Sequence, residues 1–143
     1  MNFHSYAMII ISVMAGLLST MNIWVSNITD IRLHTNDFYM AFLMTGWMLL
    51  LQTIIFFNHI DHANVFIIVS ILIIFVTFIL IRTQAFVDDT QYINGMIPHH
   101  SMAILMSEKI KEKSNNKFII NLANSIIKSQ QEEINFMNKY YCD

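Results

Sequence analysis

The segment ANVFIIVSILIIFVTFILI, residues 63–81, is an uninterrupted run of nineteen uncharged and mostly aliphatic or aromatic residues. A helix needs about 20 predominantly apolar residues to cross the hydrocarbon core of a membrane. A helix on the surface of a soluble protein would instead alternate an apolar stripe with a polar face. The sequence therefore predicts a transmembrane helix here, and this helix decides which class of fold to expect.

Two similar segments precede it. They read YAMIIISVMAGLLSTMNIWV, residues 6–25, and FYMAFLMTGWMLLLQTIIFF, residues 38–57. Trp24 and Tyr39 near their ends suit the membrane–water interface, where amphipathic rings gather. We therefore expect three transmembrane helices within residues 1–84. Small residues predict a close helix–helix contact on the first of them: Ser12, Ala15, Gly16 and Ser19.

Charged residues divide the chain of 143 residues into two regions. Only 13% of all residues are charged, whereas soluble domains average about 25%. Residues 1–84 hold five of the eighteen Asp, Glu, Lys and Arg residues, and residues 85–143 hold the other thirteen. This predicts a membrane region over 1–84 and a water-exposed domain over 85–143. The net charge of −2 and the lack of a basic run argue against a nucleic-acid-binding protein.

Residues 85–143 have the pattern of a helical hairpin. From residue 119 to residue 137, apolar residues recur at spacings of three and four, which predicts an amphipathic helix. Ser114, Asn115 and Asn116 before it are typical turn and cap residues. We expect an all-α protein whose hairpin packs on the membrane helices or pairs with a second copy into a four-helix bundle.

The third membrane helix has no obvious end. No Gly or Pro occurs between Ala63 and Asn94, so the two residue types that most disfavour a helix are missing. We expect this helix to continue out of the membrane as a stalk to about Gly95, and so into the hairpin.

The stretch NGMIPHHSMAILM, residues 94–106, combines three methionines with two adjacent histidines and the chain's one proline. On a helix, its potential metal donors share one broad face with Asp89 and Tyr92. Pro98 predicts a kink or a new helix start, because it removes one backbone donor. Thioether and imidazole groups are ligands that Cu(I) accepts. The donors that make this face a candidate copper site are Met96, His99, His100 and Met106.

The same residues have a plainer interpretation. Met is a common filler of apolar cores. The two histidines have candidate hydrogen-bond partners in Gln130 and Glu133 of the following helix. Residue types and spacing alone leave both interpretations open.

About residues 87–139 resemble the family catalogued as domain of unknown function 305. The resemblance rests on DDTQYINGMIPHHSMAILMSEKI, which contains the Met-Ile-Pro-His-His signature at residues 96–100, and on LANSIIKSQQEEINFM after it. Asp88 or Asp89 stands at the acidic position of the pattern and Tyr92 at the aromatic one. The second helix matches at Gln130, Glu133, Ile134 and Met137.

This resemblance implies a ferritin-like helical fold and an extracytoplasmic copper-binding protein linked to copper resistance. The copper ligands that it implies are Met96, His99, His100, Met106 and Met137. Supporting roles fall to Asp89, Tyr92, Gln130 and Glu133. Of these, Gln130 or Glu133 would orient a histidine ring, as residues behind metal ligands commonly do.

A second group of methionines lies in the membrane region. Met40, Met44 and Met48 recur every four residues along the second predicted helix. A stripe of thioethers is a candidate path for Cu(I). The eukaryotic copper-uptake channels are similar in having three spans with a Met-x-x-x-Met motif in the second. Methionines at this spacing are also common in ordinary helix packing. A copper-conducting pore is therefore kept as an alternative to the leading function.

The sequence as a whole predicts a multi-pass integral membrane protein, in contact with lipid and forming homo-oligomers, that handles Cu(I) or confers copper tolerance. An enzyme with a small-molecule substrate is not expected, because the sequence lacks the motifs Gly-x-Ser-x-Gly, P-loop and His-Glu-x-x-His. A structural or oligomerising membrane protein without metal is the second alternative. Arg32 and Arg82 favour a cytoplasmic hairpin by the positive-inside rule. The resemblance favours an extracytoplasmic hairpin, and we adopt that expectation.

Overall fold

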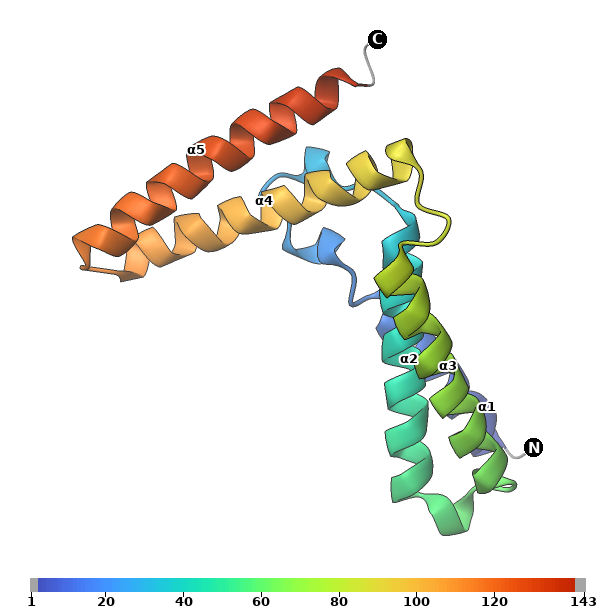
Figure 1. Ribbon diagram of the computed structural model, residues 1–143. Coiled ribbons are helices and arrows are strands. Elements are labelled where there is room, and N and C mark those ends of the chain that lie inside the picture. The colour runs from blue at the N-terminus through green and yellow to red at the C-terminus, as the bar shows by residue number, and fades with distance from the viewer. Residues whose placement is uncertain (1–2, 141–143) are drawn as a thin grey trace. The chain divides into compact units, whose positions relative to one another are not determined.

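The computed structural model describes residues 3–140, and every regular element within them is helical (Figure 1). The α-helices are α1 (Phe3–Leu17), α2 (Thr35–Ile55), α3 (Ala63–Thr83), α4 (Asp89–Lys113) and α5 (Lys117–Lys139). The connections contain three short 3-10 helices, η1 (Met21–Trp24), η2 (Ile28–Asp30) and η3 (Phe57–His59). The predicted all-α class is confirmed.

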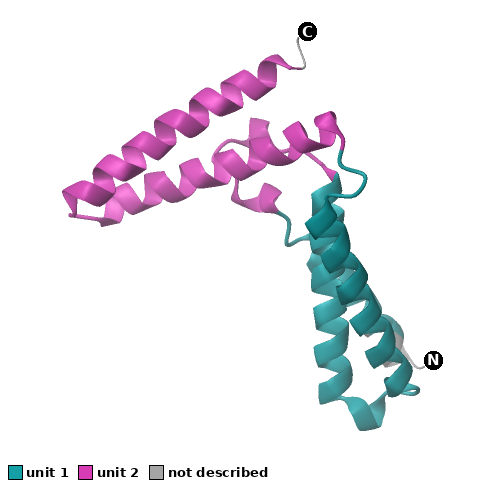
Figure 2. Ribbon diagram, viewed as in Figure 1, with its two compact units in different colours: residues 1–20, 35–87 teal, residues 21–34, 88–143 magenta. Residues whose placement is uncertain are grey.

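The helices form two compact units (Figure 2). The first comprises residues 1–20 and 35–87, and the second comprises residues 21–34 and 88–143. Residues 21–34, which we call the strap, lie between α1 and α2 in the chain. They nevertheless fold with α4 and α5.

In the first unit, α2 packs against both α1 and α3. The contact with α1 is close, because a Cβ atom on Gly16 would overlap the carbonyl oxygen of Ala41. Ser12 is fully buried, and its carbonyl oxygen accepts a hydrogen bond from Thr45 Oγ1 at 3.2 Å. The close contact predicted from small residues on the first helix is therefore confirmed at Ser12 and Gly16.

Two of the described helices, α2 and α3, are long and apolar enough to cross a membrane. The prediction of three such helices is wrong, because α1 has 15 residues. Its length is about 22 Å, against a hydrocarbon core of about 30 Å. The end of the predicted first span belongs to the strap, where Asn22 binds the backbone of Arg32. Its Nδ2 donates to the Arg32 carbonyl at 2.9 Å, and its Oδ1 accepts the Arg32 N–H at 3.0 Å.

The third and fourth helices are separate, so the predicted continuous stalk is wrong. Gln84 and Phe86 have φ angles of 48° and 59°, in the left-handed region that commonly ends a helix. Asp88 then starts α4, since its Oδ1 accepts the Gln91 N–H at 2.8 Å as an N-cap. The turn between α3 and α4 is made without Gly or Pro. The absence of these two residue types therefore did not mean that the helix continues, as was expected from the sequence.

The fourth and fifth helices form the predicted hairpin (Figure 1). Asn116 caps α5, because its Oδ1 accepts the Phe118 N–H at 2.9 Å. Ile97, Ile104 and Ile134 form the buried core between the two helices.

Helix α4 runs without interruption through Pro98, so the predicted new helix start at this residue is wrong. Pro98 is itself buried, as are Ile97 and Ser101 beside it. Tertiary contacts on both sides therefore hold the helix together where one backbone hydrogen bond is missing.

Candidate metal site

Successive residues of a helix point about 100° apart, so the residues of α4 spread around the whole helix. They can be grouped into three sides by what each side contacts. One side packs on α5 and contains Ile97 and Ile104. The second side lies against the strap and contains Gly95 and Ser101. The third side, which we call the outer seam, consists of Tyr92, Met96, His99, Ala103, Met106 and Ile110.

Ser101 joins the strap to α4. Its hydroxyl donates to Oδ2 of the buried Asp30 at 2.7 Å and accepts the backbone N–H of Ser26 at 2.9 Å. The Ser26 hydroxyl in turn donates to Glu108 Oε2 at 3.2 Å. These bonds satisfy a buried carboxylate and fix the strap along one side of α4.

The strap makes two further contacts with the hairpin. The ring of the buried His34 lies 3.5–3.6 Å from the position that a Cβ on Gly95 would take. Arg32 Nη2 donates to Asn138 Oδ1 of α5 at 3.5 Å. The strap therefore touches both helices of the hairpin.

Asp30, His34 and Ser101 are absent from the predicted set of site residues. Asp30 and Ser101 are 71 residues apart, and no local pattern connects them. The one available signal is that Asp30 is among the few charged residues of the first 84.

His100 lies on the α5 side of α4, next to Glu133. Glu133 Oε2 is 2.9 Å from His100 Nδ1, a close polar contact that does not have the geometry of a hydrogen bond. Burial lowers the pKa of His100 below its ordinary value of 6.5; Glu133 acts to raise that pKa and His99 to lower it. Because burial is the largest effect, His100 is neutral at pH 7.

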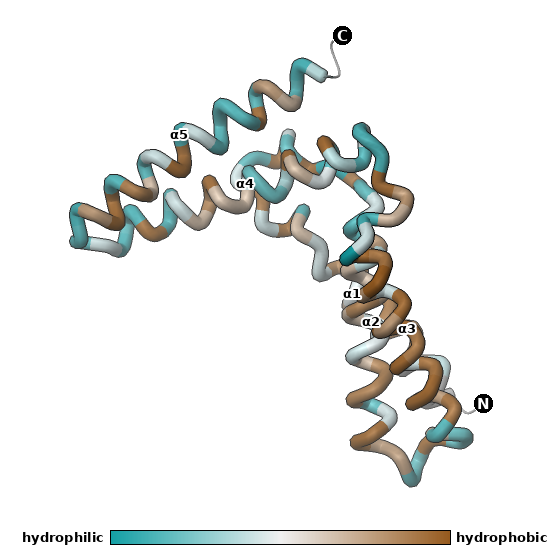
Figure 3. Tube along the Cα trace, in the orientation of Figure 1, coloured by the Kyte–Doolittle hydropathy of each residue, from teal (hydrophilic) through white to brown (hydrophobic). Residues whose placement is uncertain are grey.

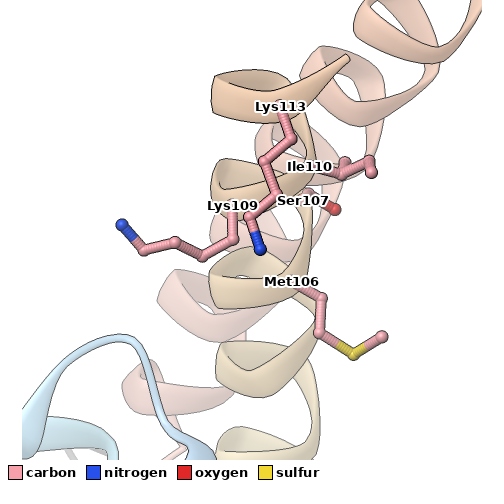
Figure 4. A pocket seen from close by; sticks show the side chains of 5 residues that line it. All are labelled: Met106, Ser107, Lys109, Ile110 and Lys113. Atoms are coloured by element: carbon pink, nitrogen blue, oxygen red, sulfur yellow. The ribbon is translucent and has the colours of Figure 1, made fainter.

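His99 and Met106 lie on the outer seam, away from α5. His99 is exposed, and its ring centroid lies 6.0 Å from that of His100 in an edge-to-face arrangement. Met106 is 63% exposed and projects from the same side of α4 as Ile110, whereas Lys109 projects to the other side (Figure 4). Met96 is half-buried. A shallow hollow beside the seam is lined by Met106, Ser107, Lys109, Ile110 and Lys113.

The remaining predicted residues occupy varied positions. Met137 packs against the isoleucine core of the hairpin. Asp89 is exposed in the first turn of α4, and Tyr92 is 57% exposed on the outer seam. Gln130 is half-buried on α5. Of the four predicted supporting residues, Glu133 is therefore the one seen against a predicted ligand.

The five predicted copper ligands fall into two groups. His100 on α4 and Met137 on α5 lie where these two helices meet, whereas Met96, His99 and Met106 lie on the outer seam. Within residues 3–140 there is no group of three or more His, Cys, Asp or Glu side chains placed to hold a metal ion. His99 and Met106 are separated by about 10 Å along the helix, too far to bind one ion together. The donor types fit a soft metal, and Met96 and His99 are the two donors of the outer seam that lie one turn apart.

The methionines of the predicted stripe lie on α2 in the first unit. Met40 and Met44 are exposed and Met48 is half-buried. Each precedes a buried residue of the same helix: Ala41, Thr45 and Leu49. The stripe therefore follows the edge of the buried side of α2, rather than its centre.

Comparison with known proteins adds two findings. The family model described as "Domain of unknown function (DUF305)" matches residues 81–141. An uncharacterized protein of Acanthamoeba polyphaga mimivirus is 53% identical to this chain over 131 residues, which are 92% of this chain and 86% of the viral protein. No solved structure matches the chain. On the family match and on a relative that extends over nearly the whole length, the chain belongs to the DUF305 family.

Proposed function

We propose that this is a multi-pass integral membrane protein that spans the bilayer with α2 and α3. Its hairpin binds Cu(I), outside the cytoplasm, in copper handling or tolerance rather than in catalysis. The observation that carries the proposal is the outer seam, which presents an imidazole and a thioether, those of His99 and Met106, to the surroundings of the protein.

The surface of the first unit supports the membrane part of this proposal. Large apolar side chains of α3, among them Ile68, Phe75 and Phe78, are exposed, and apolar residues dominate its length (Figure 3). The residues that α3 buries are small and lie seven apart: Ala63, Ser70 and Thr77. Large apolar groups outside and small groups at helix contacts are the arrangement expected in lipid.

The polar groups buried in this unit are compatible with lipid as well. The hydroxyls of Ser70 and Thr77 donate to the carbonyl oxygens of Phe66 and Ile73, at 2.7 and 2.6 Å. Each hydroxyl thus finds its partner one turn earlier in the same helix. A polar group without a partner would cost several kcal/mol inside a bilayer.

The chemistry of the hairpin supports copper. Thioether and imidazole donors select soft metals, and Cu(I) is the most common ion that accepts both. His99 and Met96 are three residues apart on one seam, so one ion can reach both. The segment that carries them lies within residues 81–141, the part that matches the DUF305 model.

His100 has a different role in this proposal. It is neutral at pH 7, as a metal ligand must be, but its Nδ1 faces Glu133. Only Nε2 is therefore available to a metal. We assign His100, which is buried against α5, to positioning the turn that carries His99.

The test is a Cu(I) titration of the full-length protein in lipid nanodiscs, in competition with a chromophoric Cu(I) chelator. The wild type is expected to take Cu(I) from the chelator, and His99→Ala to bind at least about tenfold more weakly. His59→Ala, which removes an exposed histidine outside the hairpin, is the matched control and keeps wild-type affinity. A wild type that takes no copper contradicts the proposal and favours a structural role.

A further inference from the structure

The outer seam has the spacing of a helix–helix contact. Its residues alternate at intervals of four and three from Tyr92 to Ile110, the repeat by which helices pack along a shared seam. The α5 side of α4 shows the same repeat, at Ile93, Ile97, His100, Ile104 and Ser107, and α5 fills it. The outer seam therefore has the same spacing as the side of α4 that packs against α5.

No described helix of the second unit fills the outer seam. Tyr92, Met106 and Ile110 are 57%, 63% and 42% exposed. These are large and mostly apolar groups, which proteins tend to cover. Within the second unit, α5 and the strap occupy the other two sides of α4 and leave this third side open.

The charges of α4 indicate what covers the seam. The helix begins with Asp88 and Asp89, and its last two turns carry Lys109, Lys111 and Lys113 together with Glu108 and Glu112. Lys109 Nζ pairs with Glu112 Oε1 at 2.8 Å. The beginning therefore has a charge of −2, and residues 108–113, with three lysines and two glutamates, have a net charge of +1. No charged residue lies on the seam between Tyr92 and Ile110. A second α4 running in the opposite direction would set the acidic end of each helix against the basic end of the other, with a neutral apolar strip between them.

We propose that the outer seam binds the same seam of a second copy, antiparallel and centred on Ala103, and that the pair completes two equivalent Cu(I) sites. This rests on the proposed function. His99 lies four residues before Ala103 and Met106 three residues after it. An antiparallel pair therefore places His99 opposite the partner's Met106 on each side of the two-fold axis.

This arrangement resolves the incompleteness of the site within one chain. His99 and Met106 are about two turns apart on their own helix, but across the seam each meets the donor that it lacks. Met96, one turn from His99, is a third donor for the same ion. The small side chain of Ala103 at the centre lets the two helices approach closely.

Cysteine cross-linking tests the pairing without metal. In a Cys142→Ser background, Ala103→Cys is expected to form disulfide-linked dimers in nanodiscs or native membranes. Tyr92→Cys and Lys113→Cys are expected to cross-link to each other when co-expressed, and neither to itself. Ser125→Cys on the exposed side of α5 is the matched control and stays monomeric. Self-cross-linking of Tyr92→Cys shows parallel helices and overturns the proposal, as does the absence of any cross-link through the seam.

Mixing two defective variants tests the shared site. His99→Ala and Met106→Ala each destroy both sites of a homodimer. A heterodimer of the two retains one intact site, built from the His99 of one chain and the Met106 of the other. With different affinity tags to isolate it, this heterodimer is expected to bind about half the copper of the wild-type dimer.

The outcomes separate this inference from the proposed function. If the wild type binds Cu(I) and the heterodimer does not, the shared site is wrong and copper binding stands. If the wild type binds no Cu(I), the proposed function fails, and the shared site with it, whatever the cross-links show. A nitroxide on Met106→Cys that contacts lipid-soluble oxygen instead of a second nitroxide would assign the seam to the membrane surface and overturn the pairing.

Discussion

His99 and His100 are neighbours in the chain, yet their rings lie in different surroundings, because successive helical residues point about 100° apart. His100 is buried beside Glu133 and His99 is exposed on the outer seam. Burial penalises the charged form of the His100 imidazole. One step along the helix therefore decides which of the two rings is buried and which is exposed.

The pKa of His100 gives a prediction for stability. It is lowered from 6.5 in the folded protein, with burial as the largest cause, so the unfolded chain binds a proton at higher pH than the folded chain. The free energy of unfolding is therefore constant above about pH 6.5 as far as His100 is concerned, and decreases as the pH falls below it. NMR titration of the His100 ring in nanodiscs is expected to give a midpoint below 6.5.

Glu133→Gln sharpens this prediction. Glu133 acts to raise the pKa of His100, so its neutralisation is expected to lower that midpoint further. Glu132→Gln removes the adjacent carboxylate, which points away from Glu133 by about 100°, and is expected to leave the titration unchanged. A midpoint that rises in Glu133→Gln contradicts the assigned contact.

Ser101 gives a second prediction at this scale. Ser101→Ala leaves the buried Asp30 carboxylate without its hydroxyl donor and the Ser26 N–H without its acceptor. An unsatisfied buried group costs about 1–3 kcal/mol, so the strap is expected to open more often. Hydrogen exchange of residues 21–34 measures this as faster deuteration. Ser125→Ala on the exposed side of α5 is the control, and equal exchange in both variants would contradict the network.

At the scale of elements, short-range signals predicted much of the fold. Asn116 caps α5 as its residue type suggested, and the spacing of apolar residues predicted the side of α5 that meets α4. The end of α3 was not predictable in the same way. Gln84 and Phe86 adopt left-handed angles that residues of their types rarely take, so tertiary structure decides this turn.

Two glycines in helices give opposite predictions. A Cβ on Gly16 would overlap the Ala41 carbonyl and lie 3.0 Å from Thr45 Oγ1. Gly16→Ala is therefore expected to displace α1 and to cost about 1–3 kcal/mol by overpacking. A Cβ on Gly95 would make ordinary contact with the His34 ring at 3.5 Å. Because Ala is the better helix former, Gly95→Ala is expected to gain up to about 1 kcal/mol.

Thermal unfolding of the two variants in the same detergent measures this difference. Gly16→Ala is expected to melt below the wild type and Gly95→Ala at or above it. The pair is matched in chemistry, since each adds one methyl group within a helix. If both melt below the wild type, the space that the structure gives to Gly95 is wrong.

At the scale of the whole molecule, the sequence could not show where the strap belongs. Residues 6–25 read as one span, but their last part folds as η1 with α4. Asn22 is hydrogen-bonded to the backbone of Arg32, and Asp30 is hydrogen-bonded to Ser101. The contact between Asp30 and Ser101 joins distant parts of the chain. The predicted donor residues of α4 are close together in sequence. Their division between two sides of α4 depended on where α5 and the strap pack.

Membrane topology is the prediction that belongs to the whole chain. If α2 and α3 both cross the bilayer, Asn58 in η3 lies on one face, and the strap and hairpin lie on the other. In a Cys142→Ser background, Ser129→Cys is expected to react with a membrane-impermeant maleimide on intact cells, and Asn58→Cys only after permeabilisation. Labelling of both without permeabilisation would show that the two helices do not cross. The reverse pattern would place the hairpin in the cytoplasm, as Arg32 and Arg82 favour by the positive-inside rule.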